Sequence, residues 1–146
     1  MIRFQTIDVM MPNLDLDQVR DWIQAVVSGC GYRVGELHYY FCSDEALLEI
    51  NRSRLGHDFY TDIVTFPLEE GECISSEFCI SVDRIAENCL NFGRTFESEL
   101  LRVIIHGVLH LTGFDDHSDE DRSRMRQKEE ECLVLFYKQL NINKIQ

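Results

Sequence analysis

The sequence has 146 residues, of which 45% are hydrophobic and 27% charged, and its formal net charge is −12. This length is typical of one domain, and the aliphatic and aromatic content excludes a disordered or low-complexity protein. The charge excludes a uniformly basic nucleic-acid-binding surface but permits a local basic groove. No apolar run reaches the roughly 18–20 residues of a membrane span, and residues 1–17 lack the pattern of a signal peptide. We therefore expect a cytoplasmic protein without a membrane partner, folded as a single domain over residues 1–146.

Two strands and two helices are expected in the first part of the chain. A strand is expected over Ile2–Val9, and apolar residues recur at helical spacing over Leu16–Ser28, after Asp15 as the capping residue. The aromatic run Leu37–Cys42 is typical of a strand, and Ser43 is placed to cap the helix that follows it.

Two further strands and three helices are expected in the rest of the chain. The strands cover Asp62–Phe66, which Pro67 ends, and Glu77–Val82. The helices begin near Asp83, at Thr95 and at Ser118, and they end at Gly93, near Thr112 and near Leu140. This order of elements predicts an α+β protein with a four-stranded mixed β-sheet packed with about five helices.

The six cysteines show no CxxC pair. Structural zinc on cysteines needs paired spacing, so this pattern argues against it. Because no secretory signal is visible, we expect reduced thiols, most of them in the core.

The stretch that carries the chemistry is Val103–Asp121. His106 and His110 stand four residues apart on an expected helix, so that both imidazoles project from one face. Gly113 ends this helix, and three candidate residues follow in the turn: Asp115, Asp116 and His117. Two helical histidines and a third ligand from the next loop leave one tetrahedral position for water, which is the arrangement of a catalytic zinc site.

Histidines at this spacing also occur as ordinary surface or core residues. Here, however, the flanking helical residues are almost all apolar: Ile104, Ile105, Val108, Leu109 and Leu111. Two imidazoles in such a helix are costly without polar partners. Together with the acid-and-histidine cluster after Gly113, this favours a metal site on the helix and the loop after it.

The motif HGVLHLTGFDD, residues 106–116, closely resembles the signature of the YbeY family, whose members are bacterial single-strand-specific endoribonucleases. The segment NRSRLGHDFYTDIVTFP, residues 51–67, is similar to the family's segment that ends in Thr-Asp-Val-Leu-Ser-Phe-Pro. The strand at Glu77–Ser81 stands where the family has a Gly-Asp-hydrophobic strand, with Ser76-Glu77 in place of Gly-Asp. The resemblance covers most of the chain.

This resemblance implies a zinc-dependent endoribonuclease with one Zn²⁺ per chain. It implies action in ribosomal RNA maturation, at the 16S 3′ end, and in ribosome quality control. The expected partners are single-stranded RNA or rRNA and the ribosome or small-subunit assembly proteins, and no DNA is expected.

The third metal ligand departs from the family pattern, because Asp116 stands where the family has a histidine. The register from Gly113 to Met125 needs no inserted residue, which favours Asp116 as the ligand beside the two histidines. His117 is the alternative if the turn bulges by one residue. The expected catalytic acid/base residues are Asp115 and His117, or Asp116 if His117 is the ligand. Asp119 and Glu120 are outer candidates.

A second departure is Leu55, where the family commonly has an arginine that faces the substrate. Arg52 and Arg54 stand close by and can replace it, and with His57 they form the expected RNA-binding group. The basic residues of segment 122–128 are instead expected on a solvated helix face, paired with Glu129–Glu131.

Two alternatives remain open. A metzincin-like metalloprotease shares the His-x-x-x-His-x-x-Gly pattern, but its general base is a glutamate at the position that Gly107 occupies here. The other alternative is a non-catalytic, zinc-stabilised ribosome-assembly binding module, which a fourth protein ligand such as His57 would support.

Overall fold

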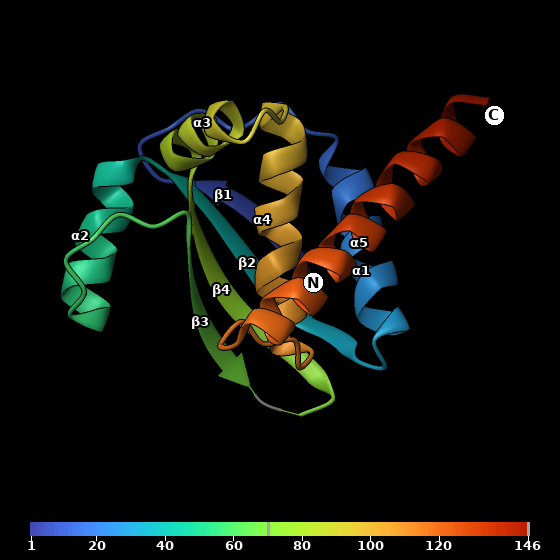
Figure 1. Ribbon diagram of the computed structural model, residues 1–146, viewed down its shortest axis with the longest axis horizontal. Coiled ribbons are helices and arrows are strands. Elements are labelled where there is room, and N and C mark those ends of the chain that lie inside the picture. The colour runs from blue at the N-terminus through green and yellow to red at the C-terminus, as the bar shows by residue number, and fades with distance from the viewer. Residues whose placement is uncertain (70, 146) are drawn as a thin grey trace.

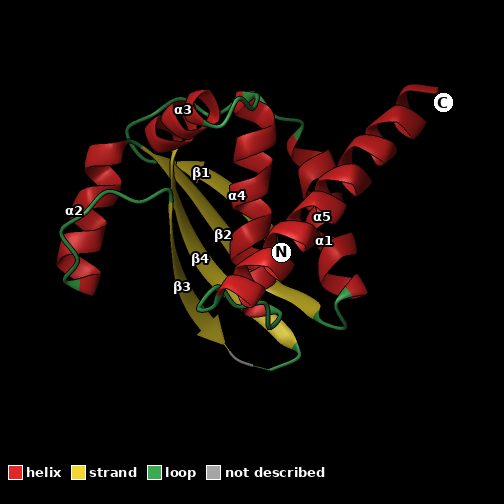
Figure 2. Ribbon diagram, in the orientation of Figure 1, coloured by secondary structure: helices red, strands yellow, loops and turns green. Residues whose placement is uncertain are grey.

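The four strands form one sheet in the order β1-β2-β4-β3 (Figures 1 and 2). The computed structural model describes residues 1–69 and 71–145. The strands are β1 (Ile2–Thr6), β2 (Arg33–Cys42), β3 (Ile63–Glu69) and β4 (Cys73–Ser81). β2 pairs in parallel with β1 and with β4, whereas β3 pairs antiparallel with β4 at the edge. The sheet is therefore mixed, and the predicted α+β class is confirmed.

Five helices cover this sheet in the described part of the chain. They are α1 (Leu16–Gly29), α2 (Asp44–Leu55), α3 (Val82–Asn91), α4 (Phe96–Leu111) and α5 (Asp119–Ile145). Buried residues of α1, α3, α4 and α5 share one hydrophobic cluster with one face of the sheet. α2 instead packs on the opposite face of the sheet, in a second, smaller hydrophobic cluster, and lies apart from α4 and α5 in Figure 1.

The alternation of side chains along β2 separates these two clusters. Leu37, Tyr39 and Phe41 lie in the large cluster, while Tyr40 and Cys42 lie in the small one with α2. This is the period of two that a pleated strand imposes. Because both faces are covered, the aromatic run reads as almost continuously apolar in the sequence.

Four strand boundaries differ from the prediction by three or four residues, for identifiable reasons. β1 ends before Asp8, which has a positive φ of 57° and accepts hydrogen bonds from the Ser43 backbone N–H and hydroxyl group. β3 continues through Pro67, which an edge strand tolerates because one side of its backbone needs no partner. β2 and β4 each begin four residues early, at Arg33 and Cys73, because these two residues pair with each other beyond an irregularity in the β2–β4 register.

The ends of α4 agree with the sequence signals. The Thr95 side chain accepts a hydrogen bond from the Ser98 backbone N–H over 3.1 Å, as expected of a capping residue. The helix ends at Leu111, and Thr112 is its C-terminal capping residue. Within the described helices, none contains a stretch both long and apolar enough to span a bilayer.

Candidate metal centre

Two imidazole rings of α4 lie against each other in the second half of the helix. The Nε2 atoms of His106 and His110 are 3.0 Å apart, and the two ring planes make an angle of 86°. The two side chains are 26% and 29% exposed, respectively. The spacing of four residues therefore does bring both Nε2 atoms to one point, as predicted.

The turn after α4 returns the chain to these histidines. Gly113 has a φ of 103°, in the left-handed region that residues with side chains rarely adopt. Beyond it, Asp116 Oδ2 lies 3.4 Å from His110 Nε2. Arg122 of α5 donates a hydrogen bond from Nη1 to the Asp116 carbonyl oxygen over 3.1 Å, which fixes the far side of the turn.

The three side chains fit a divalent transition metal. One ligand atom from each of His106, His110 and Asp116 lies within 4.8 Å of the other two. Metal–ligand bonds of about 2.0–2.1 Å at tetrahedral angles place neighbouring ligand atoms about 3.3 Å apart. The separations of 3.0 Å and 3.4 Å are close to that value. Among the described residues no fourth protein ligand joins this group, and His57 lies outside it.

A buried carboxylate contacts His106 from behind. His106 Nδ1 lies 2.6 Å from Glu129 Oε2, and Glu129 Oε1 accepts a hydrogen bond from Arg102 Nη1 over 2.8 Å. Glu129 is only 4% exposed. The expectation that Glu129 pairs with a solvated basic face is therefore wrong.

A signal for Glu129 was present in the spacing of the last helix. Met125, Cys132 and Phe136 are buried, and Glu129 falls on the same face, four residues after the first and three before the second. A carboxylate on an apolar stripe needs a partner inside the protein. Sequence alone does not say which partner, since His106 lies 23 residues away.

Asp62, immediately before β3, lies close enough to His106 for the two charges to interact. Burial raises the pKa of the Asp62 carboxyl, and the nearby positive charge of His106 opposes this rise only in part. Burial by itself lowers the pKa of His106. The hydrogen bond to Glu129 and the negative charges of Glu129, Asp62 and Asp116 outweigh burial, so that the pKa of His106 is raised. Asp62 was not among the predicted site residues, although it belongs to the segment TDIVTFP that carries the resemblance.

Asp115 and His117 lie on the outer side of the turn. His117 Nε2 is 3.1 Å from Asp115 Oδ1, and the two side chains are 82% and 55% exposed. A second group of possible metal ligands consists of Asp115, Asp116 and His117. Of these three, only Asp116 also belongs to the group that contains His106 and His110. The geometry thus brings Asp116, rather than His117, next to the two histidines.

The expected RNA-binding residues lie around the C-terminal end of α2. Each has a partner of its own: Arg52 forms an ion pair with Asp58, the Arg54 guanidinium lies 4.0 Å from the centre of the Phe66 ring, and the His57 ring stacks on Phe59. Phe66 packs with the α2 cluster, on the sheet face opposite the one that α4 covers. The structure therefore does not bring these three side chains to the histidines.

A cavity of about 600 Å³ opens beside His110. Its walls come from the α1–β2 turn, from β3 and β4 near the turn that joins them, and from the end of α4: Gly31, Tyr32, Pro67, Gly71, Glu72, Ile74, His110 and Leu111. One aromatic ring, several apolar side chains and a candidate metal ligand in a single concave surface are typical of a substrate site.

Fold and site together define a class: α+β proteins that present a His-x-x-x-His helix and an acidic turn as a candidate hydrolytic metal centre. The profile of one family, Endoribonuclease YbeY, matches residues 5–136. The chain belongs to this family, which is metal-dependent and is involved in ribosomal RNA processing. The resemblance inferred from the sequence is confirmed.

Two curated relatives and one solved structure illustrate the match. The chain is 42% identical over 134 residues to Endoribonuclease YbeY of Bacteroides thetaiotaomicron, covering 92% of this chain and 98% of the relative. It is 44% identical over 136 residues to Endoribonuclease YbeY of Phocaeicola vulgatus, covering 93% and 99%. The solution structure of TM1509 from Thermotoga maritima is similar with a TM-score of 0.65 at 28% identity, covering 98% of this chain and 93% of that one. Family membership favours the endoribonuclease over the metalloprotease and over the non-catalytic module.

Proposed function

We propose that the protein is a metal-dependent endoribonuclease specific for single-stranded RNA, with its hydrolase domain spanning residues 1–146. It would act in ribosomal RNA maturation, at the 16S 3′ end, and in ribosome quality control in the cytoplasm. The observation that carries this proposal is the group formed by His106, His110 and Asp116 in a chain of this family. His110 Nε2 lies 3.0 Å from His106 Nε2 and 3.4 Å from Asp116 Oδ2.

In this proposal His106, His110 and Asp116 hold one Zn²⁺ per chain. When bound, zinc would lower the pKa of a water molecule towards neutrality and polarise the phosphodiester that is cut. The protein must present the two imidazoles as neutral ligands and keep the carboxylate ionised. Because Asp116 replaces a neutral histidine, this ligand set carries one more negative charge than three histidines would.

Proton transfer needs a group near the ligands, and two candidates differ in environment. The Asp115–His117 pair is exposed, and the 3.1 Å contact orients the His117 imidazole, which is the group that would donate a proton to the leaving oxygen. Asp62 is the second candidate, because burial raises the pKa of its carboxyl and so favours the protonated form. His117→Ala and Asp62→Asn separate the two, since only loss of the true acid lowers kcat while zinc content is unchanged.

The cavity beside His110 is the place for the nucleotide next to the scissile phosphate. Tyr32 offers a ring on which a base can stack, a contact that every base can make. Nucleotides farther along the RNA would contact Arg52, Arg54 and His57, which lie on the other side of the edge strand β3. Because the net charge is −12, we also propose that the ribosome or a small-subunit assembly protein supplies part of the attraction for RNA.

The experiment that tests this function uses one purified protein and four substrates: single-stranded RNA, duplex RNA, single-stranded DNA and casein. After removal of metals by chelation and reloading with Zn²⁺, we expect cleavage of single-stranded RNA alone. The variants His106→Ala and His110→Ala should lose both zinc and cleavage. Proteolysis of casein that depends on His106, or no RNA cleavage with any divalent metal, would contradict the proposal.

A further inference from the structure

Glu129 of α5 reaches His106 of α4 through the ring nitrogen that faces away from the metal-ligand group. The 2.6 Å contact joins Glu129 Oε2 to His106 Nδ1, while His106 Nε2 is the atom that meets His110 at 3.0 Å. In the neutral ring, a proton on Nδ1 can donate to the carboxylate, and the lone pair is then on Nε2.

We propose that Glu129 is a positioning residue for the metal centre, which holds His106 in the Nδ1–H tautomer with Nε2 directed at the metal. This proposal rests on the metal centre proposed above. Which nitrogen of a histidine binds a metal is set by the hydrogen bond that the other nitrogen makes. Without an acceptor at Nδ1, the ring is free to place its proton on Nε2 and to rotate about χ2.

Arg102 holds Glu129 in turn. Arg102 and His106 are one helical turn apart on α4, and the two oxygens of Glu129 bridge them, with 2.8 Å between Arg102 Nη1 and Oε1. Arg102 is 8% exposed and Glu129 is 4% exposed, so water does not compete with these contacts. Both oxygens must accept, because each faces an N–H donor. A glutamine cannot do this, since its amide group would place its own N–H groups against one of the two donors.

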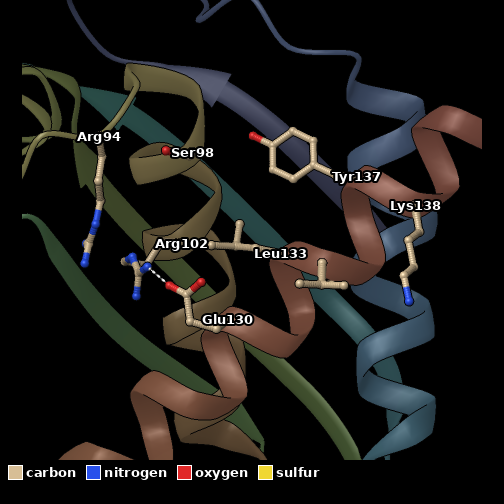
Figure 3. Close-up of a pocket in the computed structure, with 8 residues that line it drawn as sticks. Arg94, Ser98, Arg102, Glu130, Leu133, Tyr137 and Lys138 are labelled. Atoms are coloured by element: carbon tan, nitrogen blue, oxygen red, sulfur yellow. Dashed lines mark hydrogen bonds and ion pairs between the residues drawn. The ribbon is translucent and has the colours of Figure 1, made fainter.

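The neighbouring residue provides a matched control. Glu130 also pairs with Arg102, through Nη2, but its side chain is 62% exposed and makes no contact with His106 among those described. Figure 3 shows this pair at a cavity of about 470 Å³ between α4 and α5, together with Arg94 and Lys138. Glu130→Gln removes the same charge from the same helix and the same guanidinium, and it leaves the Glu129–His106 contact in place.

A carboxylate that only joins α4 to α5 would affect folding but not the metal. The test is therefore zinc affinity, measured by competition with a chelator at a single pH. We expect Glu129→Gln to weaken zinc binding about 10- to 100-fold, the usual cost of losing such a partner, and Glu130→Gln to change it less than about threefold. In the zinc-loaded wild-type protein, ¹⁵N shifts should show the metal on His106 Nε2 and the proton on Nδ1.

Glu129→Gln leaves a buried guanidinium with an imperfect partner, so this variant can unfold for that reason alone. The double variant Arg102→Met/Glu129→Leu removes the buried guanidinium and the acceptor for His106 Nδ1 together, and it should still show the loss of zinc affinity. Zinc affinity within threefold of wild type in a folded variant that lacks Glu129, or coordination of zinc through His106 Nδ1 in the wild-type protein, would overturn the role of Glu129. If the wild-type protein binds no zinc at His106 and His110, the metal centre itself fails instead.

Discussion

Gly107 of α4 lies directly against Phe78 of β4. A Cβ atom at Gly107 would stand 2.7 Å from Cε1 and 2.9 Å from Cδ1 of this fully buried ring. Because Gly107 has no side chain, α4 can approach the sheet this closely at the residue that follows His106. It also gives a second reason against a metalloprotease, because the position at which such enzymes have glutamate faces the sheet here.

Gly107→Ala should destabilise the protein, although alanine favours helices by about 1 kcal/mol. The added methyl group meets a ring that has no room to move, and overpacking of this kind costs about 1–3 kcal/mol. Urea unfolding measures the effect. The control is Gly29→Ala at the end of α1, where nothing lies within 4 Å of the added atom and no loss of stability is expected. Equal stability of Gly107→Ala and the wild type would contradict the close contact.

Asp116→Ala should lower zinc affinity more than His117→Ala does. Asp116 Oδ2 lies 3.4 Å from His110 Nε2, whereas His117 is 82% exposed and pairs with Asp115. Chelator competition on both variants gives the order directly. The opposite order would mean that the turn rearranges when metal binds and that His117 is the third ligand.

The double variant Arg52→Ala/Arg54→Ala should bind single-stranded RNA more weakly, with a flatter salt dependence. Each phosphate contact that is lost reduces the slope of log K against log salt by roughly 0.7. The matched control, Arg126→Ala/Lys128→Ala, removes the same charge from α5 and should leave the slope unchanged. If both double variants have the wild-type slope, the α2 end is not part of the RNA-binding surface.

The metal-free protein should lose stability as pH rises through the raised pKa of His106. Burial alone lowers this pKa, but the hydrogen bond and charge of Glu129 and the charges of Asp62 and Asp116 outweigh it. A group whose pKa is higher in the folded state stabilises the fold below its unfolded pKa, about 6.5, and this contribution disappears above the folded pKa. With zinc the trend should reverse, because protons then compete with the metal.

Unfolding midpoints at pH 6 and pH 8, with and without zinc, measure this effect. The difference between wild type and His106→Gln isolates it from other titrating groups. A metal-free difference that is the same at both pH values would show that Glu129 does not favour the protonated ring.

Thiol labelling should divide the six cysteines into two groups. Burial raises the pKa of Cys42 to about 12 and the pKa values of Cys79 and Cys132 to about 11, so these thiols carry almost no thiolate at pH 8. Cys89 is also buried, whereas Cys30 and Cys73 are half-buried. A disulfide-exchange reagent should therefore label at most these two in the folded protein and all six in urea. Rapid labelling of a third thiol in the folded state would contradict the packing of the core.

The sequence itself determined those features that depend on neighbouring residues. The spacing of His106 and His110 is a local property of a helix, so the contact between their rings could be predicted without the fold. The same holds for the caps at Asp15 and Thr95, and the order of elements was enough to predict a mixed four-stranded sheet. The motif around the histidines was also enough to indicate the family.

Only the tertiary structure decided what surrounds the histidines. Glu129 comes from α5 and Asp62 immediately precedes β3, and nothing local in the sequence indicates that either one lies near His106. The choice between Asp116 and His117 as the neighbour of His110 depends on a single turn closed by Gly113 and held by α5. The strand limits depended on pairing as well, since Pro67 is tolerated only because β3 lies at the edge of the sheet. In each case the cause is packing between segments far apart in the chain, which residue spacing does not encode.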